Sequence, residues 1–180
     1  MRIPAKTLPI LSTKQKREWE EVMGKNFISE AYLRKRSNDD SKYELKLGQI
    51  GDLRVVEAKT EPTDLFTDFD FNKKEKILDI LQEFYVVSGE VEVTFKNSSY
   101  LLKKGSILVI DNNDLPESFR VTKRSHIIVV YMPTALVRSW IPRIYKNLKS
   151  KLISPPGASA KLLGSYLELI SEFAINTNNS

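Results

Sequence analysis

The stretch from Glu83 to Asp111 constrains the fold of this chain more than any other part of the sequence. It reads EFYVVSGEVEVTFKNSSYLLKKGSILVID. From Val91 to Phe95 apolar and polar residues alternate, which is typical of a strand with one buried face. ILVID is a continuous apolar run, which predicts a strand that is covered on both faces. We therefore predict four short strands here, with Gly89 and Gly105 at turns between them.

Similar patterns lie on both sides of this stretch. YELKLGQIGDLRVVEAKTE predicts two strands that are joined near Gly48–Asp52, and SFRV followed by HIIVVYM predicts a final hairpin. EPTDLFTDFDFNKKEK is interpreted as a loop, with Phe66, Phe69 and Phe71 closing one mouth of a barrel. About eight strands with short turns predict a mainly β fold, a closed antiparallel barrel or jelly roll.

Helical patterns flank the predicted barrel at both ends. Ser12 and Gln15 form a capping box that starts a short helix, so we place a barrel domain with an N-terminal helix at residues 12–132. After Pro133 the spacing of apolar residues becomes helical, and Pro142 is expected to kink or restart that helix. The residues that follow, 133–176, are predicted to form a helical subdomain.

The second helix of that subdomain has the spacing of a coiled-coil seam. It is predicted from about Ala158 to Ala174, after the break SPPG. Its apolar residues recur at intervals of three and four, and their surface is wider than one seam. We expect the helix to cover its own barrel and to pair with a second copy in a homodimer. The residues predicted to make the dimer contact are Leu163, Tyr166, Leu167, Ile170 and Phe173.

The composition excludes several kinds of site. The chain has no cysteine, which removes thiolate nucleophiles and cysteine-ligated zinc. Its only histidine is His126, so it cannot build the multi-histidine metal site of many barrel enzymes. No nucleophile elbow, phosphate loop or dinucleotide motif is present. We therefore predict no enzyme activity, no metal and no cofactor.

The charge and hydropathy patterns give expectations about location and partners. The formal net charge is +5, and the basic residues are scattered along the chain. This pattern does not favour nucleic-acid binding. No run approaches the ~18 apolar residues of a membrane span, and the start lacks a signal-peptide pattern. A cytoplasmic protein is expected.

Five residues are candidates for contact with a small molecule inside the barrel. Arg54 lies between apolar neighbours and would need a carboxylate if it points inward. Tyr85 and Phe119 could stack on an aromatic compound, and His126 and Glu117 could add polar contacts. A structural histidine at a strand start, and an arginine that points outward, are the competing interpretations. The sequence leaves their inward or outward register open.

The order of these motifs resembles the N-terminal regulatory domain of AraC/XylS-type transcription activators. The resemblance rests on FYVVSGEVEVTFKNSSYLLKKGSILVID followed by SFRV, IIVVYMPTALV, IPRI and AKLLGSYLELISEFA, and on REWEEVMGKNF before the barrel. It implies a cupin-like barrel that binds a small effector and a last helix that dimerises. It also implies a C-terminal domain with two helix-turn-helix motifs. That domain is absent from this sequence, so we expect no specific DNA binding by this chain alone.

Two other functions stay open at this point. One is a metal-independent cupin enzyme, such as a sugar epimerase or isomerase. The other is a scaffold barrel without a small ligand. The sequence names neither the effector nor its target genes, and it does not distinguish activation from repression.

Overall fold

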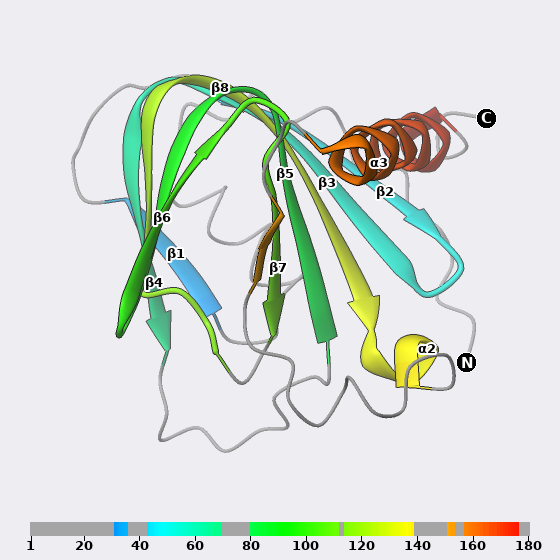
Figure 1. Cartoon of the computed structure of the whole chain (residues 1–180), viewed down its shortest axis with the longest axis horizontal. Helices are drawn as coiled ribbons and strands as arrows, with labels where there is room; N and C mark the ends of the chain where they lie inside the picture. The colour runs from blue at the N-terminus through cyan, green and yellow to red at the C-terminus, as the bar shows by residue number, and fades with distance from the viewer. Residues whose placement is uncertain are drawn as a thin grey trace.

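A computed structural model describes residues 31–35, 43–69, 80–111, 114–138, 151–153 and 157–176. Within these ranges the strands pair antiparallel in one sheet that folds into two layers, and a long helix lies on the outside (Figure 1). The fold is therefore mainly β with α, a cupin-like jelly roll, as predicted. The elements are β1 (Ala31–Lys35), β2 (Tyr43–Ile50), β3 (Leu53–Thr60), β4 (Thr63–Phe69), β5 (Ile80–Phe95), β6 (Ser98–Lys103), β7 (Ile107–Asp111), β8 (Ser118–Pro133), α2 (Thr134–Arg138), β9 (Lys151–Ile153) and α3 (Ala158–Asn176).

Strands β5 and β8 run through both layers and join them. Each has 16 residues, and they pair with each other along nearly their whole length. In one layer β5 pairs with β7 while β8 pairs with β3, and β2 and β9 extend this layer. In the other layer β5 pairs with β6 while β8 pairs with β4, and β1 extends it. We call these the helix-side layer and the opposite layer, because α3 contacts the first.

The predicted turn at Gly89 and the predicted hairpin within β8 are both wrong. Each segment is one continuous strand that bends from layer to layer (Figure 1). The register between them shifts at three places between Val86 and Val91, which marks a bulge. A bulge bends a strand and increases its twist, so it turns the strand pair without ending it.

Gly89 and Ser125 hold this bulge together. Gly89 has a φ of 91°, and a Cβ there would lie 2.2 Å from Ser125 Oγ and 2.5 Å from the Arg124 carbonyl oxygen. Ser125 is buried, and its Oγ accepts a hydrogen bond of 3.0 Å from the Glu90 backbone N–H. The same hydroxyl donates to the Lys123 carbonyl at 2.7 Å. The bend thus needs a residue without a side chain on one strand and a small hydroxyl on the other.

Other sequence predictions have mixed outcomes. The hairpin of β2 and β3 is confirmed, and ILVID is a strand with both faces largely buried. The segment interpreted as a loop forms strand β4 over Thr63–Phe69, so Phe66 and Phe69 lie in a strand. Strand β9 returns to pair with β7, which adds a strand to the predicted helical region 133–176. The N-terminal helix, Phe71 and Pro142 lie outside the described residues.

Two hydrophobic clusters occupy the two faces of the helix-side layer. The inner cluster fills the space between the layers and contains Val56, Phe84, Val93, Val129 and Tyr131 among others. The outer cluster includes Val55, Tyr85, Ile128 and Val130 and packs against Leu167 of α3. Alternation along each strand assigns every residue of this layer to one face or the other.

Small residues let α3 lie close to the sheet. The side of the helix that faces the sheet is buried, and a Cβ on Gly48 of β2 would lie within 2.6–2.8 Å of Ala174. The buried helix residues follow spacings of four and three: Ala160, Gly164, Leu167, Ser171 and Ala174. The predicted helix over Ala158–Ala174 is thus confirmed, with the narrow face that contacts the sheet now identified.

Replacing Gly89 by alanine is expected to lower the free energy of unfolding by about 3 kcal/mol or more, because it combines a positive φ with a backbone clash. Gly51 is the matched control, since it has a φ of 57° and no other atom lies within 4 Å of the place that a Cβ would take. Gly51→Ala should therefore lose only about 1 kcal/mol. Urea unfolding followed by circular dichroism measures both values, and equal losses would contradict this account of the bend.

Candidate functional site

Three polar side chains lie side by side on the inner face of the helix-side layer. Tyr131 of β8 is paired with Gln82 of β5 on one side and with Arg54 of β3 on the other. Cross-strand partners point to the same face, and Tyr131 belongs to the inner cluster. Gln82 and Tyr131 are buried, and Arg54 is half-buried. This row places an amide, a phenol and a guanidinium on an otherwise apolar wall.

Burial raises the pKa of the Tyr131 phenol well above its usual range. The phenol therefore stays neutral at physiological pH and can both donate and accept a hydrogen bond. Arg54 adds a planar guanidinium group with several N–H donors. Together the row can recognise carbonyl, hydroxyl and carboxylate groups.

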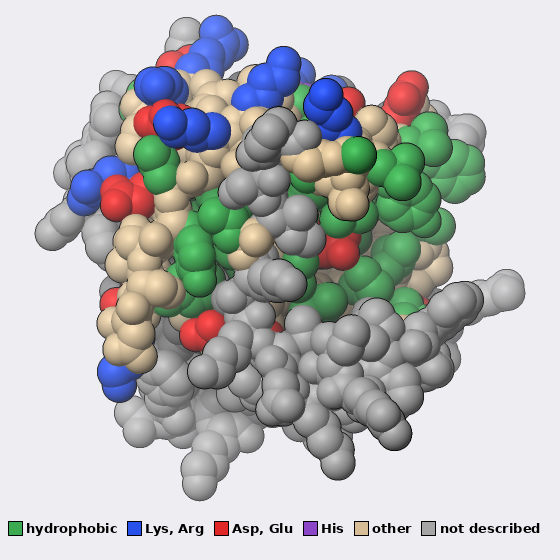
Figure 2. All heavy atoms as spheres, in the orientation of Figure 1, with side chains coloured by type: hydrophobic (Ala, Val, Ile, Leu, Met, Phe, Trp, Pro, Cys, Tyr) green, Lys and Arg blue, Asp and Glu red, His purple; other side chains and the backbone are tan. Residues whose placement is uncertain are grey.

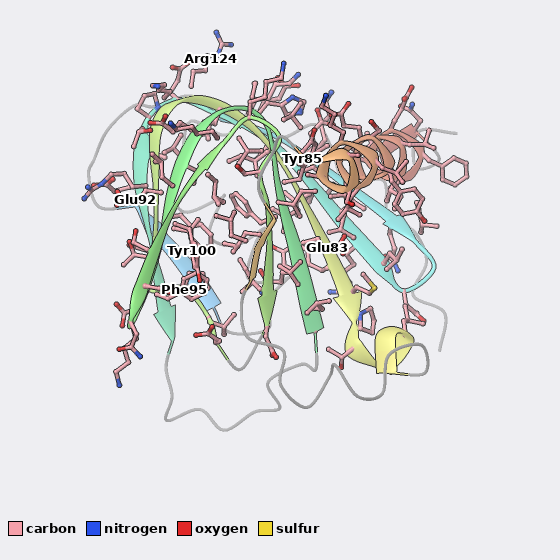
Figure 3. The ribbon with its side chains drawn as sticks, in the orientation of Figure 1. Glu83, Tyr85, Glu92, Phe95, Tyr100 and Arg124 are labelled. Carbon is pink, nitrogen blue, oxygen red and sulfur yellow. The ribbon has the colours of Figure 1, made fainter. Side chains whose placement is uncertain are left out.

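Aromatic rings fill the inner space where the two layers face each other. Phe84 of the helix-side layer stacks on Phe119 of the opposite layer, with ring centroids 5.5 Å apart and planes inclined by 22°. Further along, Phe95 and Tyr100 meet edge to face at 5.7 Å and lie inside the opposite layer (Figure 3). The Phe84–Phe119 stack is therefore a direct contact between the layers.

Several inner-face side chains keep partial contact with solvent. Phe119 is half-buried, although Val93 beside it is fully buried. Tyr100 is also half-buried against the same inner cluster, as are Ala58 and Leu115. An apolar wall that is partly open to solvent and carries a few fixed polar groups is the usual composition of a small-molecule site.

The structure separates the predicted site residues. Arg54 and Phe119 lie on the inner face. Tyr85 and His126 point to the outer face, where the His126 Nε2 lies 2.8 Å from Glu57 Oε1. Glu117 is exposed. Tyr85 points to the outer face and Phe119 to the inner face. The two rings therefore cannot stack on the same molecule inside the barrel.

Sequence reasoning missed Gln82 and Tyr131. A signal for Gln82 was present, since it is an uncharged polar residue in the apolar segment ILQEFYVV. Its buried position could be recognised only once Tyr131 and Ile110 were known as its neighbours. Among the described residues, no group of three or more histidine, aspartate or glutamate side chains gathers where a metal ion could bind.

Tyr85 connects the outer face of the sheet to α3. Its hydroxyl donates a hydrogen bond of 2.8 Å to Glu168 Oε1 (Figure 3). Burial, the hydrogen bond and the charge of Glu168 together raise the pKa of Tyr85 to about 12, so it remains a donor at neutral pH. On the same face of β5, burial raises the pKa of the Glu83 carboxyl.

The outward side of α3 carries an apolar stripe. It consists of Leu162, Tyr166, Leu169 and Phe173, which are 76%, 58%, 63% and 58% exposed. Hydrophobic side chains accordingly gather over α3 in the space-filling view (Figure 2). This stripe has the spacing of four, three and four that one side of a coiled coil requires.

The stripe differs in part from the predicted dimer contact. Tyr166 and Phe173 belong to it, while Leu163 and Ile170 are half-buried beside it. Leu167 is only 1% exposed and packs in the outer cluster, so it cannot meet a partner while α3 stays on the sheet. The sequence period allowed several neighbouring stripes, and only the position of the sheet distinguishes them.

Lysine and arginine side chains gather where β5 and β8 bend between the layers (Figure 2). Arg124 points away from the barrel there (Figure 3) and lies 3.5 Å from Glu61. Nearby, Arg120 pairs with Asp64 at 3.0 Å, and Lys123 pairs with Glu90 at 3.2 Å. Acidic partners thus offset much of this positive charge, and the region is not a strong field of one sign.

Comparison with solved structures identifies the architecture. The chain shares its fold with the AraC-like transcriptional activator CuxR. The match has a TM-score of 0.70 and 18% sequence identity, and it covers 91% of this chain. This chain spans only 60% of the CuxR chain.

Other solved structures match less of the chain. An RmlC-like cupin protein from Desulfovibrio desulfuricans has a TM-score of 0.41 and 15% identity, over 51% of this chain and 82% of its own. KdgF from a Halomonas species has a TM-score of 0.38 and 20% identity, over 51% and 80%. No protein-family model and no curated protein sequence matches the chain. None of the described helices is long and apolar enough to cross a membrane.

Proposed function

We propose that this chain is the regulatory domain of an AraC-like transcription regulator. In this proposal it senses a small molecule between its two layers, dimerises through α3 and works in the cytoplasm without enzyme activity. The observation that carries the proposal is the shared fold with CuxR over 91% of the chain. DNA binding would belong to a further domain, in keeping with the 60% of the CuxR chain that is matched.

The inner face would supply the effector site. Arg54, Gln82 and Tyr131 would hold polar groups of the effector, and the half-buried ring of Phe119 would contact its apolar part. Polar groups at fixed positions favour compounds that carry matching groups, so this row would provide most of the specificity.

The stripe on α3 would supply the dimer contact. Leu163 and Ile170 flank it on one side, and Ser165 and Glu172 flank it on the other. In an antiparallel pair of helices each flank meets the same flank of the partner, whereas in a parallel pair unlike flanks meet. The antiparallel pair brings apolar residues together on one side, so we propose that arrangement around a two-fold axis.

An aspartate in the stripe should disrupt the dimer. We expect Tyr166→Asp or Leu169→Asp to weaken dimerisation by at least about 30-fold, because a charge would be buried without a partner. Lys161→Asp is the control, since it places the same side chain on an exposed position of α3 outside the stripe. Sedimentation equilibrium with circular dichroism measures both association and folding. A wild-type monomer at tens of micromolar, or equal weakening by the control, would overturn the proposed interface.

A screen of small carboxylates, sugars and phosphorylated metabolites by thermal unfolding tests the sensor proposal. A compound at about 100 times its dissociation constant should stabilise the fold by about 2.7 kcal/mol and raise Tm by roughly 5–10 °C. Arg54→Met and Gln82→Leu should abolish this shift, while His126→Ala and Glu117→Ala should retain it. A shift lost only with His126→Ala or Glu117→Ala would place the site elsewhere.

A further inference from the structure

We propose that the Phe84–Phe119 stack controls dimerisation through Tyr85, the residue that follows Phe84. A compound that displaces the stack would change the position of α3, and with it the geometry of the apolar stripe. This inference rests on the proposed function, because it assumes that the stripe is the dimer contact.

The Phe84–Phe119 stack lies where the two layers touch. Phe84 and Phe119 belong to different layers and touch across the inner space. Phe84 is buried and Phe119 is half-buried, so the Phe119 ring keeps some contact with solvent. A molecule that enters at this level has to move one ring or separate the layers, because protein interiors are close-packed.

Strand β5 links the stack to the outer face, because Phe84 and Tyr85 are consecutive residues. Phe84 points to the inner face and Tyr85 to the outer face, and a movement of one backbone segment displaces both side chains. In Figure 3 the Tyr85 side chain lies beside α3. A displacement that begins inside the barrel therefore reaches the helix within one residue.

Tyr85 is in close contact with α3. A Cβ on Gly164 would lie 2.8 Å from the Tyr85 hydroxyl oxygen and 2.9 Å from Cζ. The hydroxyl also donates to Glu168, one turn along the helix, at 2.8 Å. Tyr85 thus touches the helix backbone and holds a side chain by a hydrogen bond.

The contact between α3 and the sheet leaves one polar group unsatisfied within the described part of the chain. Ser171 is buried on the face of α3 that contacts the sheet, and its Oγ has no hydrogen-bond partner among the described residues. A buried hydroxyl without a partner is unfavourable, so a shift of α3 that gave it one would recover part of the free energy lost elsewhere. The contact between α3 and the sheet thus contains one group that a shift of the helix could satisfy.

The same rigid helix carries the contact at one side and the stripe at the other. Glu168 and Gly164 face Tyr85, while Tyr166 and Leu169 lie on the exposed side. A shift of the helix moves all of them together. Ligand occupancy would thus change the dimer dissociation constant without any ligand contact to α3, which is the definition of allosteric coupling between two sites.

The test is a double-mutant cycle on the whole chain, with the dimer dissociation constant measured by sedimentation equilibrium. Phe84→Leu removes the stack without changing a residue of the outer cluster that packs against α3. We expect it to change the dissociation constant by about five-fold or more. Phe119→Leu should act in the same direction, because it removes the other ring of the stack from the opposite layer. It also serves as the second variant if Phe84→Leu does not fold.

Val91→Ala is the matched control. Val91 is fully buried on the inner face of β5, but it lies beyond the bulge in the opposite layer. Its substitution should change the dissociation constant by less than about two-fold. The effect of Phe84→Leu should be smaller in a Tyr85→Phe background, which removes the hydrogen bond to Glu168 and keeps the ring beside Gly164. Equal effects of Phe84→Leu and Val91→Ala, or an unchanged effect in the Tyr85→Phe background, would overturn the inference.

Hydrogen exchange of the α3 amides distinguishes failure of this link from failure of the dimer proposal. Should the wild type be a monomer, Phe84→Leu is still expected to speed exchange in α3 more than Val91→Ala does, since the link lies within one chain. Equal exchange in the two variants would reject the link itself.

Discussion

The antiparallel pairing of β5 with β8 is the interaction on which the rest of this structure depends. Each strand belongs to both layers, so the pair sets the distance and angle between them. The bend requires the positive φ of Gly89 and the small, hydrogen-bonded side chain of Ser125. Without it the two strands would extend one open sheet, and the inner space would not exist.

The two faces of the helix-side layer contact different parts of the molecule. Its inner face carries Tyr131 and Phe84, and its outer face carries Tyr85 and Ile128. Because Gly48, Gly164 and Ala174 lie where α3 meets the sheet, the helix approaches the sheet closely at these points. The position of the helix therefore depends on the shape of the sheet surface that it contacts.

Sequence reasoning anticipated much of the fold and part of the candidate site. It predicted the β2–β3 hairpin and the α3 helix because local spacing and turn residues determine them. It predicted turns where β5 and β8 bend, because Gly89 in β5 and the polar stretch TKRS in β8 have the same local signature in a turn and in a bend. It named Arg54 as a possible inward residue, but it could not place Tyr85 and His126 on the opposite face. Alternation shows which residues share a face without showing which face is inside.

The sequence by itself determined the class of the fold, the chain positions of most strands and the apolar helix at the end. It also excluded sites that need cysteine or several histidines, since those side chains are missing. The tertiary structure alone decided that Gln82, Tyr131 and Arg54 form one row, and that Tyr166 faces outward while Leu167 faces the sheet. The reason is physical. Local periodicity fixes the relative directions of neighbouring side chains, but only contacts between distant segments give those directions an inside and an outside.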